Sequence, residues 1–293
     1  MKYITLREMN DAIRKNLWKI PRDIDFILGI PRSGVLAGSI IAEHLNCPMT
    51  DVDAFCSGAK PTGGARLRYW KPKHATGRKK VLVVDDTVWN GGSKTTARKK
   101  LEPYASDYEF IYLVVFLEGP GESSVDIWLE DVRQYTNGFR ETVLYEWNIV
   151  NHNENTMYAS IYDIDGVLCL DPPDERNAVE YQRYIKDATP LFIPTPTVGA
   201  IVTYRLSSNA EVTKEWLGRQ GVTYRRIEFF PADTWEERHA SGISPERYKA
   251  DYYRNAGWAK LFVESDDAQA RKIFEMTGKP VYCVGTNRMY ANL

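Results

Sequence analysis

Runs of apolar residues alternate along the first half of the chain with segments of helical period. Val81–Val84 and Phe110–Leu117 are apolar throughout, and Ile24–Ile30 is nearly so, which is typical of parallel strands buried on both faces. Thr5–Trp18 and Ala37–Leu45 instead follow the small and apolar patterns of helices. This alternation predicts an α/β fold with a mainly parallel sheet flanked by helices.

The same alternation restarts after a short polar stretch, Asn153–Asn155, which we interpret as a linker. The 293 residues suit two domains of about 150 residues each. We therefore expect one domain over residues 1–152 and a second over residues 157–293, each built on a mainly parallel sheet. The strand-like runs of the second half are Met157–Tyr162, Val198–Val202 and Leu261–Val263.

Residues 81–94, VLVVDDTVWNGGSK, carry the strongest chemical signal of the first half. A buried strand ends in Asp85 and Asp86, and a small-residue turn, Thr87–Ser93, leads into a predicted helix, Lys94–Leu101. Backbone N–H groups of such a turn, together with the helix dipole, point at one place and form a phosphate cradle. The two carboxylates before it suit a ligand that carries both a phosphate and vicinal hydroxyls. The alternative is an ordinary strand–turn–helix whose acids cap the helix.

This run resembles the 5-phosphoribosyl-1-pyrophosphate (PRPP) signature of the type I phosphoribosyltransferases. The resemblance implies that Asp85 and Asp86 hold the ribose hydroxyls while the turn binds the 5-phosphate. Trp89 is bulky for a cradle, and the family usually has Thr or Ser where this chain has Asn90. The turn residues implied to contact the phosphate are Thr87, Asn90, Gly91, Gly92 and Ser93.

A second turn, Gly29–Gly34 (GIPRSG), also follows a predicted strand and precedes a helix. It resembles the pyrophosphate loop of the same family, which often contains a strained or cis peptide. The resemblance implies pyrophosphate contacts from Arg32, Ser33 and Gly34. A plain structural turn between strand and helix is the alternative.

Two further stretches fit the same resemblance. Ser57–His74 has no apolar period and mixes Gly, Pro and cations, and the family carries a flexible lid here that excludes water. Its candidate cations are Lys60, Arg66 and Arg68, and a solvated surface loop is the alternative.

Thr142–His152 lies where the family has a hood over the base, with Trp147 suited to stacking and Asn148 to hydrogen bonding. An aromatic packing cluster at a domain join is equally compatible with that stretch.

The second half begins with a strand that ends in Asp163-Ile-Asp165-Gly. This pattern also occurs in Ca²⁺ loops, but the later residues favour a resemblance to the haloacid dehalogenase (HAD) phosphatases over Tyr158 to Thr286. The resemblance implies a nucleophilic Asp163, a proton-donating Asp165, a phosphate-binding Thr203 and a neutralising Lys249. It also implies a Mg²⁺ ion held by carboxylates. The candidate metal ligands are Asp163, Asp165, Glu264, Asp266 and Asp267.

About 35 residues separate the first acidic motif from Thr203, which leaves room for a short helix, Asn177–Ala188, and for only a minimal cap.

Composition narrows the class of protein further. A formal net charge of −1 gives no global reason to expect nucleic acid or an anionic membrane as a partner. Met1–Asn10 has no apolar signal core, and the longest apolar run, near Ile111–Leu117, is far too short to span a bilayer. The cysteines show no metal-binding spacing and resemble reduced thiols. We therefore expect a soluble, cytoplasmic protein.

Together these patterns predict a bifunctional enzyme. One half transfers a phosphoribosyl group from PRPP to a nucleobase-like acceptor, with Mg²⁺, and gives a nucleoside 5′-monophosphate and pyrophosphate. The other half hydrolyses a phosphate monoester through an aspartyl phosphate. A PRPP-binding regulator with a separate phosphatase activity is the first alternative, and a phosphatase with a degenerate transferase half is the second. The sequence leaves open the acceptor base, the order of the two reactions and a homodimeric state.

Overall fold

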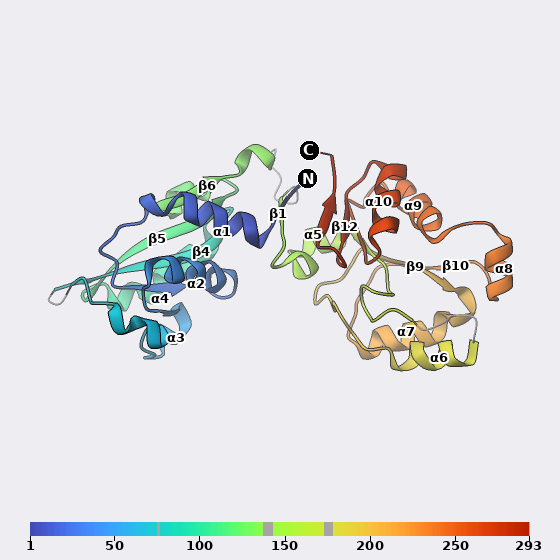
Figure 1. Ribbon diagram of the computed structural model, residues 1–293, viewed down its shortest axis with the longest axis horizontal. Helices are drawn as coiled ribbons and strands as arrows, with labels where there is room; N and C mark the ends of the chain where they lie inside the picture. The colour runs from blue at the N-terminus through green and yellow to red at the C-terminus, as the bar shows by residue number, and fades with distance from the viewer. Residues whose placement is uncertain (75–76, 137–142, 173–177, 293) are drawn as a thin grey trace. The chain divides into compact units, whose positions relative to one another are not determined.

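The apolar runs of the sequence form the central strands of two separate parallel sheets. The computed structural model describes residues 1–74, 77–136, 143–172 and 178–292, which fall into two compact units (Figure 1). The first unit is residues 4–143, and the second is residues 1–3 together with residues 144–293. Thr142 and Asn177, which begin two of the predicted segments, lie outside the described residues.

The first unit contains a five-stranded sheet in the order β3-β2-β4-β5-β6, and all its neighbouring strands are parallel. Its strands are β2 (Phe26–Gly29), β3 (Met49–Asp51), β4 (Lys79–Val88), β5 (Tyr108–Leu117) and β6 (Ile127–Asp131). β1 (Lys2–Ile4) and β7 (Val143–Tyr145) pair with each other in a two-stranded sheet.

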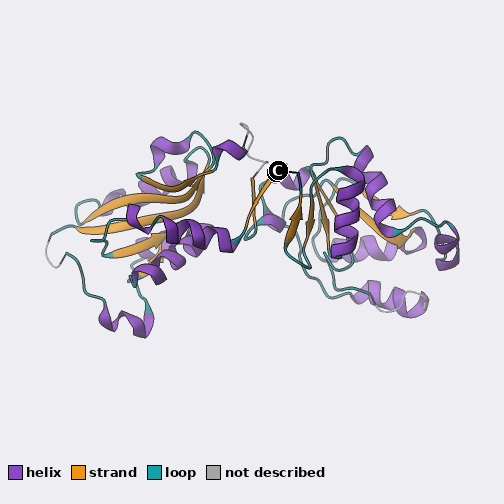
Figure 2. Cartoon of the chain, turned by 45° about the horizontal axis from the view of Figure 1, so that its top comes forward, coloured by secondary structure: helices purple, strands orange, loops and turns teal. Residues whose placement is uncertain are grey.

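Helices cover both faces of the five-stranded sheet because both faces of its central strand are apolar (Figure 2). Val81 and Val83 of β4 pack in one cluster with Ala97 and Leu101, whereas Leu82 and Val84 point to the opposite face and are equally buried. The helices are α1 (Leu6–Lys15), α2 (Ser33–Leu45), α3 (Val52–Cys56) and α4 (Gly92–Leu101). Short 3-10 helices lie at Leu17–Lys19, Gly64–Tyr69, Glu102–Tyr104, Gly121–Ser124 and Arg133–Tyr135.

Two segments of this unit differ from the prediction. Strand β4 does not end at Val84 but continues to Val88, because β5 offers it an equally long apolar partner. Asp85, Asp86 and Thr87 therefore belong to the strand, and the turn is shorter than expected. The edge strand β6 (Ile127–Asp131) is not among the strands predicted from the sequence.

The second unit contains a six-stranded sheet in the order β10-β9-β8-β11-β12-β13, and its last pair is antiparallel whereas the others are parallel. Its strands are β8 (Ser160–Tyr162), β9 (Ala200–Leu206), β10 (Ile227–Phe230), β11 (Leu261–Glu264), β12 (Val281–Cys283) and β13 (Arg288–Tyr290). Its helices are α5 (Glu154–Tyr158), α6 (Ala178–Asp187), α7 (Ala210–Arg219), α8 (Trp235–Ala240), α9 (Pro245–Asn255) and α10 (Asp267–Thr277), with 3-10 turns at Ile149–Asn151 and Ser207–Asn209.

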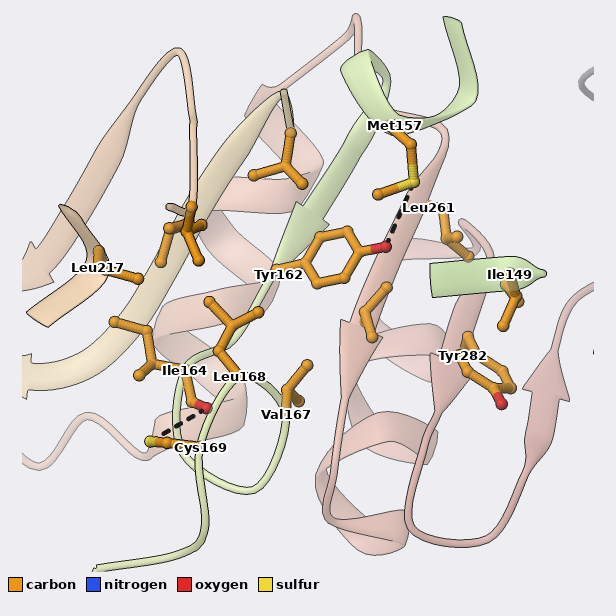
Figure 3. Packing of buried hydrophobic residues seen from close by; sticks show 14 of the residues in the cluster. Ile149, Met157, Tyr162, Ile164, Val167, Leu168, Cys169, Leu217, Leu261 and Tyr282 are labelled. Carbon is orange, nitrogen blue, oxygen red and sulfur yellow. Dashed lines mark hydrogen bonds between the residues drawn. The ribbon is translucent and has the colours of Figure 1, made fainter. Parts of the chain in front are cut away.

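The structure divides the chain at residue 143/144, about ten residues before the expected linker. The reason is packing: Leu144, Ile149 and Met157 are buried in the same cluster as Tyr162 of β8 (Figure 3). The hydroxyl of Tyr162 donates to Sδ of Met157 at 3.6 Å. Leu144 and Ile149, from the stretch interpreted as the hood, are therefore part of the second unit's core, whereas the linker residues Asn153–Asn155 are not.

No helix in the described part of the chain is both long and apolar enough to cross a membrane. The four cysteines are all free thiols, and three of them are buried.

Asp25 is a buried carboxylate at the start of β2, with 1% of its surface exposed. It accepts hydrogen bonds from the backbone N–H groups of Lys73, His74 and Lys80 at 2.8, 3.0 and 2.9 Å, and Nδ1 of His74 lies 2.7 Å from its second oxygen. Burial alone would raise the pKa of Asp25, but these bonds outweigh it and hold the pKa below the ordinary value of 3.8. Asp25 thus fixes the end of the loop that precedes β4.

We expect Asp25→Asn to lower the free energy of unfolding of the first unit by about 1–3 kcal/mol near neutral pH. Because the folded pKa is depressed, this contribution is present above pH 4 and is lost as the pH falls through the folded pKa. Urea unfolding at pH 7 and at pH 3.5 should therefore show a smaller difference between variant and wild type at the lower pH. Asp53→Asn is the matched control, because Asp53 is exposed and pairs only with the exposed Lys100 in the described contacts. An equal effect of both variants would contradict the prediction.

Candidate functional site

The two turns singled out in the first half follow neighbouring strands of the same sheet. Gly29 of β2 lies opposite Val84 of β4, and the N–H of Ile30 donates to the carbonyl of Val84 at 2.8 Å. After β2 the chain adds β3 on one side of it and later β4 on the other side. The strand order therefore reverses between β2 and β4. Open α/β sheets bind ligands in the crevice at such a reversal, beyond the carboxyl ends of the strands.

The turn after β2 has the backbone that the resemblance implied. The peptide bond between Pro31 and Arg32 is cis. Arg32 is exposed and precedes the first residue of α2, Ser33, so both side chains lie at the helix N-terminus. Gly34 is buried, and a Cβ there would lie 2.9 Å from Cα of Asp85 and closer still to the carbonyl oxygen of Val84. The first turn therefore packs directly on the acidic end of β4.

The turn after β4 is built around Gly91, whose φ of 80° falls in the left-handed region. Gly92 begins α4, and its N–H donates to Oδ1 of Asn90 at 3.2 Å. Asn90, the departure from the family pattern, therefore satisfies one of the N–H groups at the helix start. Thr87, predicted to contact the phosphate, lies within β4 instead.

Asp85 and Asp86, at the end of β4, are 7% and 6% exposed. The carboxylate of Asp85 accepts three internal hydrogen bonds: from the N–H of Asp86 at 3.1 Å, from the hydroxyl of Ser93 at 3.3 Å and from Nζ of Lys94 at 2.7 Å. The hydroxyl of Ser93 is thus engaged with Asp85, and its predicted contact with the phosphate stays a prediction. The motif pattern did not single out Lys94. The helical spacing of the buried positions of α4, 94, 97 and 101, could have revealed it, because it places a lysine on the face that carries the core residues.

The predicted lid cations are all exposed. Arg66 pairs with Glu43 at 3.1 Å, and the guanidinium of Arg68 lies 4.6 Å from the ring centre of Tyr69. Thr62 forms an antiparallel bridge with Met49, which ties the early part of the loop to the edge strand β3. A pyrophosphate contact from Lys60, Arg66 or Arg68 stays a prediction.

Trp147 and Asn148, predicted to contact the base, belong to the second unit. The ring centre of Trp147 lies 4.8 Å from that of Tyr145, which agrees with the alternative of aromatic packing. Their contact with a base stays a prediction.

The second candidate site lies at the reversal of strand order in the other sheet. β8 has β9 on one side and β11 on the other, and Asp163 follows β8 directly. The N–H of Asp163 donates to the carbonyl of Val263 at 3.0 Å. Asp163 thus continues the pairing with β11, and its neighbour on that strand is Glu264.

Lys249 of α9 connects these two acids. Its Nζ donates to Oδ2 of Asp163 at 2.6 Å, to Oε2 of Glu264 at 2.7 Å and to Oε1 of Gln269 at 3.0 Å. Burial raises the pKa of Asp163, and although the nearby Lys249 ammonium opposes this, the carboxylates of Glu264 and Asp165 reinforce it. Burial disfavours the charged lysine as well, yet its two acidic partners hold the pKa of Lys249 above the usual range.

Asp165 is held by a different cation. The buried guanidinium of Arg205 donates from Nε and Nη2 to the two carboxylate oxygens at 3.0 and 2.6 Å, a bidentate pair. The hydroxyl of Ser265 donates to the carbonyl of Asp165 at 3.1 Å. Arg205, visible in the sequence only as part of a Thr-Tyr-Arg run, therefore fixes the second acid of the motif.

A cavity of about 550 Å³ is lined by the three acids Asp163, Asp165 and Glu264 together with Lys249, Ser265 and Gln269. It also contains Asp171, which no sequence motif singled out; burial and the carboxylates of Asp165, Glu264 and Asp266 raise the pKa of Asp171. The lining residues are Asp163, Asp165, Gly166, Asp171, Pro172, Tyr204, Pro245, Lys249, Glu264, Ser265, Asp266, Gln269 and Gly285.

Two predicted members lie outside the lining of this cavity. Thr203 is fully buried in β9, where its Oγ1 accepts the N–H of Arg205 at 3.2 Å, and Tyr204 lines the cavity in its place. Asp267 accepts hydrogen bonds from Thr286 and Tyr290 at 2.8 and 2.7 Å. Within the described residues no three His, Cys, Asp or Glu side chains are gathered as a metal site, since Lys249 occupies the position between Asp163 and Glu264.

Comparison with known proteins identifies the first unit. The family model for the phosphoribosyl transferase domain matches residues 3–129. No curated protein matches the chain. Because of the match to the family model, we conclude that the first unit contains a phosphoribosyltransferase domain.

Several solved structures are similar to part of the chain. The xanthine-guanine-hypoxanthine phosphoribosyltransferase of Helicobacter pylori is 16% identical, with 50% of this chain and 92% of that chain covered and a TM-score of 0.34. The purine phosphoribosyltransferase of Pyrococcus horikoshii is 18% identical over 50% of this chain and 94% of its own, with a TM-score of 0.32. The orotate phosphoribosyltransferase of Aeropyrum pernix is 16% identical over 43% of this chain and 70% of its own, with a TM-score of 0.31.

The close approach of the two turns at Gly34 can be tested by adding one methyl group. Gly34→Ala should lower the free energy of unfolding by about 1–3 kcal/mol, because the new Cβ meets backbone atoms of β4 that cannot move aside. Gly38→Ala is the matched control on the same helix, where a Cβ would find its nearest neighbour at 3.5 Å. Thermal unfolding should show a loss for Gly34→Ala alone, with Gly38→Ala unchanged or slightly more stable. A neutral Gly34→Ala would mean that the turns are farther apart than described.

Proposed function

We propose that this chain is a bifunctional enzyme, in which the first unit transfers a phosphoribosyl group from PRPP to a nucleobase-like acceptor and the second unit hydrolyses a phosphate monoester. The first activity follows from the family model over residues 3–129. The observation that supports it best is the meeting of two glycine-containing turns and two acids at the carboxyl ends of β2 and β4.

In this proposal each turn binds one charged part of PRPP. The exposed Arg32 and the N-terminus of α2 hold the pyrophosphate, and the N–H groups of the Gly91-Gly92 turn, at the N-terminus of α4, hold the 5-phosphate. The buried acids at the end of β4 orient the ribose. Displacement at C1 of the ribose by a ring nitrogen of the base then yields a nucleoside 5′-monophosphate and pyrophosphate.

The phosphatase half of the proposal rests on Lys249. A carboxylate can act as a nucleophile toward an anionic phosphate only when nearby cations offset the repulsion. Lys249 contacts Asp163 directly, so it is suited to neutralise both the nucleophile and the aspartyl phosphate formed from it. Asp165 is the candidate donor of a proton to the leaving oxygen; because both its oxygens accept hydrogen bonds from Arg205, it must first leave one of these bonds and take up a proton.

The oxygen-rich lining of the cavity suits Mg²⁺, which is usually held by one or two carboxylates together with substrate phosphate and water. Four of the predicted ligands line the cavity, Asp163, Asp165, Glu264 and Asp266, whereas Asp267 lies outside the lining. Asp163 and Asp266 would hold the ion, because Arg205 engages Asp165 and Lys249 engages Glu264. The bound ion would supply charge neutralisation for an incoming phosphate.

The transferase activity can be tested by incubating the protein with PRPP, Mg²⁺ and a panel of nucleobases and by detecting the products with mass spectrometry. Asp86→Asn should lower kcat/KM for PRPP at least about tenfold, a loss of about 1.4 kcal/mol of transition-state stabilisation. Asp107 precedes β5, at the amino ends of the strands and away from the site. Asp107→Asn should therefore leave kcat/KM for PRPP unchanged. Binding of PRPP without release of pyrophosphate would instead support a PRPP-binding regulator.

The phosphatase activity can be tested with p-nitrophenyl phosphate and Mg²⁺. Asp163→Asn should reduce phosphate release at least about a hundredfold because the nucleophile is lost. Asp251→Asn is the control, since Asp251 is on the same helix as Lys249 but pairs with Arg247 and Arg254 on the surface. In the coupled reaction with PRPP and base, the Asp163→Asn variant should accumulate the nucleotide and the wild type the nucleoside. Nucleotide without free phosphate from the wild type would rule out the sequential scheme.

A further inference from the structure

Lys94 is a buried ammonium that the proposed transfer chemistry does not use. It is 1% exposed and lies at the first turn of α4, in the row of buried positions that continues with Ala97 and Leu101. An apolar side chain would be the usual residue at a buried position of this kind. A buried ammonium is costly unless charged and hydrogen-bonding partners surround it, so its partners indicate what this lysine does.

Those partners lie on the strand that precedes the turn. Nζ of Lys94 donates to Oδ2 of Asp85 at 2.7 Å and also to the backbone carbonyl of Thr87. One ammonium therefore joins the end of β4 to the start of α4 and closes the intervening turn at its base. This contact therefore braces the turn that is proposed to bind the 5-phosphate.

Asp85 is enclosed by the same arrangement. Its second oxygen accepts from Lys94 and Ser93, its first oxygen accepts the N–H of Asp86, and Gly34 of the other turn packs against it. All the hydrogen-bond donors described for this carboxylate belong to the protein itself. Asp85 is thus engaged with the fold through three hydrogen bonds, and a carboxylate with that many donors still has acceptor capacity for a ligand hydroxyl.

We propose that Lys94 is a positioning residue of the PRPP site. It turns the carboxylate of Asp85 inward, neutralises its charge beneath an anionic ligand and sets the turn that receives the 5-phosphate. This inference rests on the proposed transferase function of the first unit.

The test is a double-mutant cycle read out by the dissociation constant for PRPP, measured by calorimetry with Mg²⁺ present. Lys94→Met should weaken PRPP binding at least about tenfold, because it leaves an unpaired buried anion next to the ligand's phosphates. Adding Asp85→Asn to Lys94→Met should restore binding to within about fivefold of the wild type, since the pair is then neutral and nearly isosteric. Asp86→Asn should lose binding in either background.

Lys100→Met is the matched control, because it makes the same chemical change on the same helix at an exposed ion pair with Asp53; its PRPP affinity should equal that of the wild type. If Lys94→Met does not fold, the comparison of the neutral double variant with Asp86→Asn decides. The inference is overturned if Lys94→Met binds PRPP like the wild type, or if the double variant loses binding as fully as Asp86→Asn. Failure of the wild type itself to bind PRPP would reject the proposed function, and this positioning role with it.

Discussion

A carboxylate at the end of a buried strand must be matched by a cation or by several hydrogen-bond donors, and the arrangement of both sites depends on this constraint. Asp85 is matched by Lys94, Asp163 and Glu264 share Lys249, and Asp165 is matched by Arg205. For Asp85, Asp163 and Asp165 the cation comes from an element later in the chain than the acid. The ion pair therefore does more than compensate charge, because it also fixes the helix or strand that carries the cation against the end of the acidic strand.

The second common feature is the place where these acids occur. In each sheet the strand order reverses beside the strand that carries the site, between β2 and β4 in the first unit and around β8 in the second. Loops that leave adjacent strands in opposite directions diverge there, and backbone N–H groups and side chains can converge on a ligand in the space between them. The two units differ in their acids and turns, yet in both of them the candidate site lies at a reversal of strand order.

The sequence predicted the parts of this arrangement that are local. Uninterrupted apolar runs identified the central strands, and the residues that end them identified both turns, Asp85 and Asp163. It did not predict that β4 extends to Val88, because the strand's length depends on pairing with β5. It missed Lys94 and Arg205 as partners and included Asp267, since tertiary packing decides which side chains meet across long stretches of chain. Thr203 shows the same limit: its position in the strand was clear, but not that it faces the core rather than the cavity.

The division of the chain at residues 3 and 144 makes the second unit discontinuous in sequence. Its first three residues are followed by the whole of the first unit, so that the phosphoribosyltransferase domain is an insertion within the unit that carries the other site. Tyr3 packs on Tyr282 at a ring distance of 5.5 Å, a contact between residues at opposite ends of the chain. During synthesis on the ribosome, the first unit emerges before residues 144–293 of the second unit. Tyr3 therefore meets its ring partner Tyr282 only when nearly all of the second unit has been synthesised.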